Sequence, residues 1–348
     1  MQRDLAPVTV RSLGEAERGR WDAFVKACPQ ASFFHLSAWQ RLIEEEQRHR
    51  THFLFAERGG DIVGVLPLAE VKSRLFGHSL ASLPFCVYGG IASEDAEAVA
   101  ALESAAERIA LDRGVSHLEY RNVQPRHADW PGQDLYVTFR KRLEADDEAN
   151  MAAIPRKQRA MVRKGIKNGL SAQRDADVSR FFSVYADNVR RHGTPALARR
   201  WFAALQNAFG DNCEVTTVCD SAANPVSSVL SFFFRDEILP YYAGDLPAAR
   251  DLAANDFKYW ALMQRAVERQ CSVFDYGRSK LGTGPYSFKK NWGFEPTPLA
   301  YEYRLFGRDS VPQNNPNNPK FKLFIALWQR MPLALTNRLG PMIVRNLG

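Results

Sequence analysis

A basic segment in the second half of the chain carries side chains that could bind or activate a charged substrate. Residues 275–294 read DYGRSKLGTGPYSFKKNWGF. Asp275 could accept a proton, Lys289 could stabilise a negative charge, and Arg278 could hold a phosphate or a carboxylate. The Gly-x-Gly turn is neither a full dinucleotide fingerprint nor a Walker loop, but it would let a ligand approach the backbone closely. A structural turn with surface lysines explains the same residues, and this alternative stays open.

A second basic segment precedes it, at residues 154–170, which read IPRKQRAMVRKGIKNGL without an acidic residue. On a helix, Arg156, Arg159, Arg163 and Lys167 would share one face, since they lie at i, i+3, i+7 and i+11. Such a face suits a polyphosphate or an RNA backbone. The candidate contacts are Arg159, Arg163 and Lys164. A basic helix that is merely solvated is the alternative.

The elements that would position these residues occur twice in the same order. Each half predicts a strand, a turn, a second strand, a segment that ends in Tyr and Gly, a helix and a last strand. In the first half the two strands are residues 53–56 and 62–71, and the next segment ends at residue 90. The helix is 92–113 and the last strand is 115–120. In the second half they are residues 215–219, 226–234, 239–244, 253–269 and 272–277. Ser93 is the expected N-cap of the first helix, and Gly114 its expected end.

This repeat predicts an α/β (α+β) protein with two tandem domains, each a mixed sheet with flanking helices. The chain has 348 residues, enough for two cores and an extension. We expect domains at 1–148 and 149–308, joined at the acidic residues 144–148, with the active site in the second. A Pro- and Asn-rich linker and a basic amphipathic tail would fill 309–348.

Composition narrows the class of protein. Hydrophobic residues make up 45% of the chain and charged residues 24%, which is typical of a globular protein. The net charge of +7 favours anionic partners without requiring nucleic acid. Five scattered cysteines without CxxC spacing predict neither disulfides nor a metal site, and they fit a reducing, cytoplasmic location. No signal peptide or membrane span is apparent in the sequence.

Particular motifs resemble known acyltransferases. The ending Phe288-Lys289-Lys290-Asn291-Trp292-Gly293-Phe294 resembles the last helix and turn of the GNAT acyltransferase fold. With Gly277-Arg278-Ser279 and the basic helix, it is similar to the Fem aminoacyltransferase family, which has two GNAT-like halves. Phe34-His35-Leu36-Ser37-Ala38-Trp39 also resembles a Fem motif, with His35 in place of the usual glutamine. The resemblance covers most of residues 20–306 and is greatest to Fem-like proteins associated with exopolysaccharide and PEP-CTERM systems.

The resemblance implies a transferase that forms an amide on a cell-envelope precursor by direct attack of an acceptor amine. Lys289 would stabilise the oxyanion, and Asp275 or Asp245 would accept the amine proton. The candidate substrate contacts are Trp39, Arg159, Arg163, Lys164, Tyr242, Arg278, Ser279 and Phe288. The acceptor would be a phosphate-bearing or lipid-linked peptidoglycan or exopolysaccharide precursor.

The donor is the main open question. Coenzyme A-dependent GNAT enzymes resemble one another in a glycine-rich pyrophosphate loop before the crossover helix. The corresponding residues 245–255 and 91–97 contain no glycine and several acids, which favours aminoacyl-tRNA over acyl-CoA and predicts no tightly bound cofactor. An acyl-CoA-dependent N-acyltransferase and a non-catalytic protein that binds anionic precursors remain the alternatives.

The tail has no acidic residue after Asp309 and carries five basic ones, interspersed with apolar residues. Such segments could lie in a membrane interface, which would make the protein peripheral at the inner face of the membrane. They could equally cap the two domains.

Overall fold

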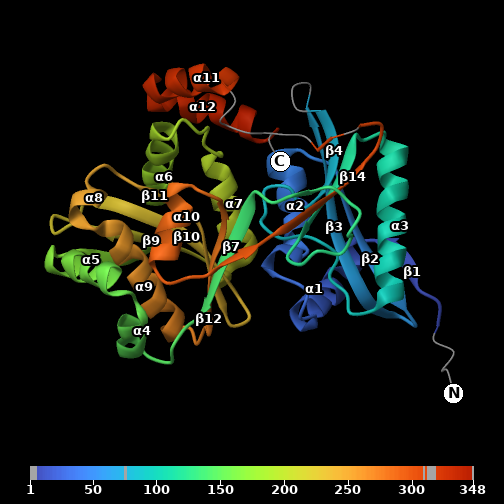
Figure 1. The fold of residues 1–348 in the computed structure, drawn as a ribbon, viewed down its shortest axis with the longest axis horizontal. Helices are drawn as coiled ribbons and strands as arrows, with labels where there is room; N and C mark the ends of the chain where they lie inside the picture. Colours follow the sequence, from blue (N-terminus) through green and yellow to red (C-terminus); the bar gives the residue numbers. More distant parts are fainter. Residues whose placement is uncertain (1–5, 74–76, 309, 312–318, 347–348) are drawn as a thin grey trace. The chain divides into compact units, whose positions relative to one another are not determined.

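The chain forms two compact units, each with its own sheet (Figure 1). The computed structural model describes residues 6–73, 77–308, 310–311 and 319–346. One unit takes in the described parts of Met1–Asp134 and Pro298–Gln313, and the other takes in Leu135–Thr297 and the C-terminal helices. The Pro- and Asn-rich linker predicted at the start of 309–348 lies mostly outside the described residues.

The first unit contains a seven-stranded mixed sheet. Its strands, in spatial order, are β1 (Thr9–Ser12), β2 (Thr51–Arg58), β3 (Asp61–Ser73), β4 (Gly77–Ser82), β5 (His117–Asn122), β14 (Ala300–Leu305) and β6 (Gly132–Gln133). Strands β4 and β5 run parallel, and α3 (Ala96–Arg113) connects them. The Gly59-Gly60 turn joins β2 to β3 as an antiparallel hairpin.

The second unit repeats this plan strand for strand. Its seven strands, in the matching spatial order, are β8 (Ser171–Asp175), β9 (Cys213–Cys219), β10 (Pro225–Phe234), β11 (Glu237–Asp245), β12 (Val273–Lys280), β7 (Tyr136–Arg142) and β13 (Pro296–Pro298). Strands β11 and β12 run parallel, and α9 (Ala254–Glu268) is their crossover helix. The predicted internal repeat and mixed α/β fold are therefore confirmed.

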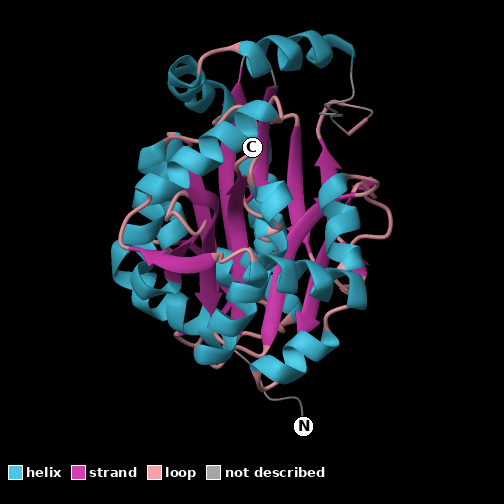
Figure 2. Cartoon of the chain, turned by 90° about the vertical axis from the view of Figure 1, so that its left-hand side faces the viewer, coloured by secondary structure: helices cyan, strands magenta, loops and turns pink. Residues whose placement is uncertain are grey.

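Helices flank both sheets (Figure 2). Besides α3, the first unit has α1 (Arg18–Ala27) and α2 (Ala38–Leu42). Besides α9, the second unit has α4 (Asp147–Ala153), α5 (Arg156–Lys167), α6 (Ser179–Arg191), α7 (Arg199–Phe209), α8 (Ala249–Leu252), α10 (Gly284–Asn291), α11 (Pro319–Arg330) and α12 (Leu333–Val344). No helix in the described part of the chain is long and apolar enough to cross a membrane.

Each sheet receives a strand from the other half of the chain. Strand β7 follows the elements of the first half but pairs with β12, whereas β14 follows those of the second half but pairs with β5. The boundaries predicted at residues 148 and 308 place these two strands in the opposite domains. Sequence alone cannot reveal the exchange, since each strand directly follows its own half's elements.

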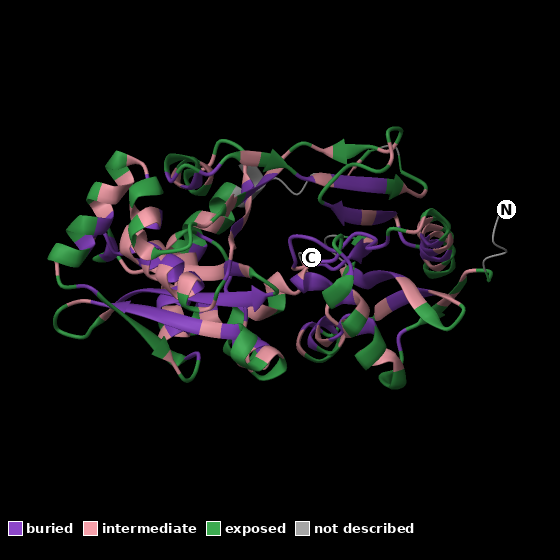
Figure 3. Ribbon diagram, turned by 90° about the horizontal axis from the view of Figure 1, so that it is seen from below, coloured by how far each residue is buried: buried purple, intermediate pink, exposed green. Residues whose placement is uncertain are grey.

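Apolar side chains from strands and crossover helix form the core of each unit. In the first unit, Leu54, Leu66 and Leu118 pack against Leu102 and Ala106 of α3. The buried residues lie on the strands and on the inward helix faces, and the outward faces are exposed (Figure 3). Helix α3 ends at Gly114, as predicted, where φ is +62°. Its N-cap is Asp95 rather than the predicted Ser93, whose hydroxyl donates to the Val63 carbonyl at 2.6 Å.

A buried carboxylate fixes the exchanged strand β14 in the first unit. Glu302 is 4% exposed. Its Oε1 accepts the N–H groups of Arg126 at 2.7 Å and His127 at 3.0 Å. Its Oε2 accepts Asn122 Nδ2 at 2.7 Å and lies 3.0 Å from His127 Nδ1. Strand β14 is therefore held by side-chain bonds in addition to its ladder with β5.

We predict that Glu302→Gln lowers the free energy of unfolding by about 2–4 kcal/mol, because the amide nitrogen leaves buried donors without an acceptor. Denaturant unfolding followed by circular dichroism measures the effect. Glu295→Gln, at an exposed position of the same half, is the control and should change stability by less than about 0.5 kcal/mol. Equal, small effects of both substitutions would contradict the assigned role of Glu302.

Candidate active site in the second unit

The parallel strands β11 and β12 separate soon after they begin. Their pairing covers Glu237 with Val273 and Ile238 with Phe274, after which β11 continues to Asp245 and β12 to Lys280. In open α/β sheets, ligands bind beyond the carboxyl ends of such strands. A ligand-binding site is therefore expected at the residues that follow the last paired positions of β11 and β12.

A β-bulge in β12 is the centre of this region. The register of β12 with β7 shifts between Asp275 and Gly277, so that Tyr276 is the extra residue. Gly277 has φ of +65°, a conformation that favours glycine, and a Cβ there would meet no other atom. The glycine is thus required by the backbone conformation of the bulge and not by space.

Lys289 binds the carbonyl groups of this bulge. It lies on α10 and is 8% exposed. Its Nζ donates to the carbonyl oxygens of Tyr276 at 2.7 Å, Gly277 at 3.0 Å and Arg278 at 3.1 Å. Burial lowers the pKa of Lys289 to about 7, although the charge of Asp275 acts in the opposite direction. The amine can therefore gain or lose a proton near neutral pH.

Asp275 holds the same bulge from the other side. Its carboxylate is 1% exposed, accepts the N–H of Gly277 at 2.7 Å and lies 3.7 Å from Arg140 Nε. Gly277 thus donates its N–H to Asp275 and accepts a hydrogen bond from Lys289. The structure brings these two predicted catalytic residues together. For Lys289 to reach an oxyanion, its Nζ must release one of the three carbonyls.

Two buried hydroxyl groups lie on the strand beside Lys289. Ser279 is 5% exposed and Tyr276 is 3% exposed, and neither hydroxyl has a hydrogen-bond partner in the described structure. A buried hydroxyl of this kind ordinarily meets water or a ligand. Ser279 is therefore the predicted substrate contact that the geometry supports best.

The other two substrate contacts predicted on this segment, Arg278 and Phe288, pack against aromatic rings. The guanidinium of Arg278 lies 4.5 Å from the ring centroid of Tyr136. Phe288 packs against Tyr259, with ring centroids 5.5 Å apart, and against Trp292 at 6.0 Å. Arg278 and Phe288 are both half-buried, so part of each side chain remains exposed to solvent.

Asp245 lies apart from the bulge, at the far end of β11. Its Oδ1 accepts Lys258 Nζ at 2.9 Å and also binds the hydroxyl of Ser227. Burial raises the pKa of Asp245, but the charge of Lys258 and the hydrogen bond from Ser227 outweigh burial and lower it overall. An ionised carboxylate in an ion pair is a weak proton acceptor. The geometry therefore favours Asp245 as an anchor of β11 on α9 rather than as a base.

Lys258 and Ser227 were missed by the sequence analysis. Lys258 is completely buried on α9. A signal was present, because Ala254, Lys258 and Leu262 recur every four residues along the buried face of that helix. A lysine within such an apolar stripe indicates a buried charge with a partner.

The other predicted contacts lie elsewhere. The hydroxyl of Tyr242 is 3.3 Å from the donor Trp201 Nε1, and its ring packs on Phe202. Trp39 is in the first unit, where it is 0% exposed and donates to the Phe33 carbonyl at 3.2 Å. His35, which replaces the glutamine of the Fem motif, is also buried there, 2.7 Å from the Gly90 carbonyl. Trp39 is therefore a core residue rather than a substrate contact.

The predicted basic helix exists as α5. Its inner face, with Val162 and Gly165, is buried and meets Phe257 of α9, since a Cβ at Gly165 would lie 2.8 Å from Phe257 Cβ. Arg163 and Lys164 are exposed and Arg159 is half-buried. Neither a carboxylate nor any other hydrogen-bond acceptor contacts these three side chains within the described residues.

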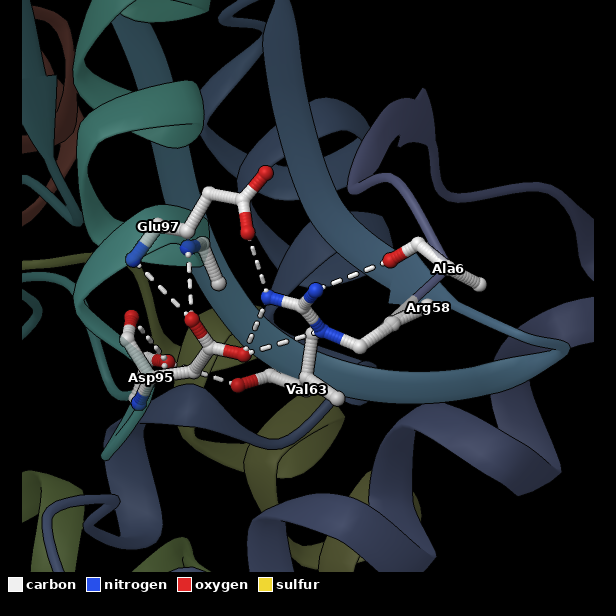
Figure 4. Close-up of polar contacts among 7 residues, drawn as sticks. Ala6, Arg58, Val63, Asp95 and Glu97 are labelled. Atoms are coloured by element: carbon white, nitrogen blue, oxygen red, sulfur yellow. Dashed lines mark hydrogen bonds and ion pairs between the residues drawn. The ribbon is translucent and has the colours of Figure 1, made fainter. Parts of the chain in front are cut away.

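The N-termini of the two crossover helices differ. At α3, Asp95 Oδ1 accepts the N–H groups of Glu97 at 2.9 Å and Ala98 at 3.1 Å (Figure 4). Arg58 forms ion pairs with the carboxylates of Asp95 and Glu97, each at 2.8 Å. The chain's own carboxylate thus occupies the place that a diphosphate would need. At α9, the N-cap Ala253 has no side chain that could accept these hydrogen bonds.

Part of the second unit matches a known protein family. Residues 156–290 match the family described as an acetyltransferase (GNAT) domain. This part of the chain is therefore similar to GNAT-type domains. The match runs from the first residue of α5 into α10, so it includes the bulge and Lys289. A search of curated proteins found no significant match.

The structure is similar to several solved structures over most of the chain. The crystal structure of FemX has a TM-score of 0.69 at 15% identity, over 91% of this chain and 100% of that chain. A tandem GNAT protein from the clavulanic acid biosynthesis pathway has a TM-score of 0.56 at 13% identity, over 87% and 100%. The C-terminal domain of a protein assigned as a lysylphosphatidylglycerol synthetase, from Agrobacterium fabrum, has 0.57 at 13% identity, over 83% and 91%.

These likenesses confirm the predicted fold, a tandem duplication of a GNAT-like domain. The match to the acetyltransferase (GNAT) domain supports the predicted enzyme class, an acyltransferase.

The position of Lys289 predicts a pH-dependent stability. Since the pKa of Lys289 in the folded protein, about 7, lies below its ordinary value of 10.5, the unfolded chain holds more protons between these two pH values. Wild-type stability should therefore rise with pH, relative to Lys289→Met, by up to about 1.4 kcal/mol per pH unit above pH 7. Denaturant titrations at several pH values measure this slope.

Lys290→Met is the matched control, because Lys290 is the exposed neighbour on the same helix. Its stability difference from wild type should not change over this range. A flat difference for Lys289→Met as well would show that its amine stays charged in the folded protein.

Proposed function

We propose that the protein transfers an acyl or aminoacyl group to an amine of a cell-envelope precursor, with the chemistry in the second unit. The observation that carries the proposal is the bulge of β12, which Lys289 and Asp275 both bind within the region that matches a GNAT domain. The buried hydroxyl of Ser279 follows two residues further along the same strand. In the first unit, Asp95 and Arg58 close the corresponding helix terminus. The first unit would then serve as a structural half.

In the proposed reaction, the acceptor amine attacks the carbonyl carbon of the donor ester or thioester. A C–N bond forms, the bond to the leaving oxygen or sulfur breaks, and the amine loses a proton. Lys289 would turn one N–H from the bulge to the developing oxyanion. The charge of Asp275 would favour the protonated form of the Lys289 amine. Asp275 remains our proposed proton acceptor, acting through water, because Asp245 is bound to Lys258.

The proposal also extends to the chemical identity of the donor and of the acceptor. The FemX-like fold and the basic helix α5 support aminoacyl-tRNA as the donor. They also support a phosphate-bearing acceptor, related to peptidoglycan or exopolysaccharide, on the cytoplasmic side of the membrane. The tandem GNAT likeness and the uncapped α9 terminus favour acyl-CoA as the second candidate. The ion pair with Lys258 also weakens the repulsion that Asp245 would exert on a diphosphate.

A thermal-shift comparison separates the two donors. The protein is heated with bulk aminoacyl-tRNA, with uncharged tRNA and with acetyl-CoA, at low and physiological salt. A rise in Tm with aminoacyl-tRNA alone supports the Fem-like transferase, and a rise with acetyl-CoA alone assigns a coenzyme A-dependent enzyme. Equal stabilisation by charged and uncharged tRNA, without transfer to any amine, would favour a protein that only binds anionic partners.

We predict that Lys289→Ala lowers the rate of transfer by about 100-fold or more, because an oxyanion donor is lost. The rate is measured with the donor that stabilises the protein, and circular dichroism establishes that the variant is folded. Lys290→Ala, on the exposed neighbour, should retain the wild-type rate. Undiminished transfer by folded Lys289→Ala protein would remove Lys289 from the mechanism.

We predict that Arg159→Glu combined with Arg163→Glu weakens binding of the phosphate-bearing substrate and reduces the salt dependence of its affinity. Lys26→Glu combined with Arg108→Glu makes the same charge change at exposed positions of the first unit and serves as the control. Affinity is measured by titration at two salt concentrations. Equal losses of affinity in both double variants would show that α5 contributes only through the net charge of the protein and is not a specific binding site.

A further inference from the structure

The two C-terminal helices are anchored to the second unit by a well-defined inner face. Gly193 and Gly340 allow close contact there, since a Cβ at Gly193 would lie 2.4 Å from Ile325 and one at Gly340 would lie 2.8 Å from the Ala196 carbonyl. Gln329 Nε2 donates to the Arg191 carbonyl at 2.9 Å. Both α11 and α12 contact α6, and Figure 1 shows them beside it.

Their outer faces are apolar, which is the reverse of an ordinary surface helix. Large apolar side chains on α11 are exposed by 37–69%, and those on α12 by 36–60%. They are Leu323, Phe324, Leu327, Leu335, Leu339 and Met342. These are six of the ten large apolar side chains that the structure shows exposed, so the feature is concentrated on these two helices.

The inner and outer faces are clearly separated on α12. Thr336 and Gly340 are buried, whereas Leu335, Leu339 and Met342 lie at i, i+4 and i+7 on the exposed side. A helix that already has a packed face gains nothing from a second apolar stripe in water. The exposed stripe therefore indicates a further apolar partner.

The charge around these side chains identifies the kind of partner. Lys322, Arg330 and Arg338 are exposed on the same helices, and no acidic residue follows Asp309. None of these three cations contacts a carboxylate among the described residues. A second copy of this face would bring like charges together, whereas an anionic lipid surface offers both apolar chains and negative headgroups.

We propose that α11 and α12 form a membrane-docking face that binds the surface of bilayers containing anionic phospholipid. Each helix of 12 residues is about 18 Å long and would lie flat, with its apolar side chains at the boundary of headgroups and acyl chains. Docking of this kind would bring the second unit to lipid-linked amines. The inference concerns membrane binding alone, so it stands or fails separately from the proposed transfer activity.

Co-sedimentation with vesicles tests the proposal. The full-length protein is mixed with vesicles of phosphatidylcholine, with or without phosphatidylglycerol. We expect sedimentation with the anionic vesicles, weaker at high salt, and about tenfold or greater loss of binding in Leu323→Glu combined with Leu327→Glu. Leu111→Glu, which places the same charge at a 63% exposed leucine of α3, is the control and should bind as wild type.

Three results would overturn the proposal. The first is wild-type protein that stays in the supernatant with both vesicle types, and the second is a double variant that sediments as wild type does. The third is a wild-type dimer in light scattering that Leu323→Glu combined with Leu327→Glu converts to a monomer, which would assign this face to a second copy. Thermal melts establish that each variant is folded.

Discussion

The exchange of one strand between the two halves of the chain is the constraint on which the structure depends. Strand β7 completes the second sheet and β14 completes the first, so each sheet contains a strand from the other half of the chain. The buried carboxylate of Glu302 helps to hold one exchanged strand, because four donors from residues 122–127 surround it. Each unit therefore contains residues from both halves of the chain, although each has its own core.

The candidate site depends on the same exchange. The bulge that Lys289 and Asp275 bind is a shift in the register between β12 and the exchanged strand β7. Strand β7 also supplies Arg140, beside Asp275, and Phe139, whose ring centroid is 5.6 Å from Lys289 Nζ. A strand encoded in the first half thus forms one side of the site in the second.

Duplication has produced two units with the same strand order but unlike crossover helices. The N-terminus of α3 is bound by Asp95 and braced by Arg58, whereas α9 begins at Ala253 without a side-chain cap. A few side chains at one turn are thus enough to make the two helix N-termini differ, with a capped terminus in one copy and no side-chain cap in the other. The outward apolar faces of α11 and α12 add a feature found on the second unit alone, within the described chain.

The repeat, the two mixed sheets, the crossover helices and the basic helix α5 could all be predicted from the amino-acid sequence, because they follow from hydrophobic periodicity and turn residues along the chain. The sequence also places Lys289 and Asp275 in one segment, and in the structure both bind Gly277. Three features could be seen only in the folded chain: which sheet receives β7 and β14, the pairing of Asp245 with Lys258, and the burial of Trp39 in a core. The reason is physical: strand partners, buried ion pairs and exposure depend on contacts between residues far apart in the chain, which local patterns do not encode.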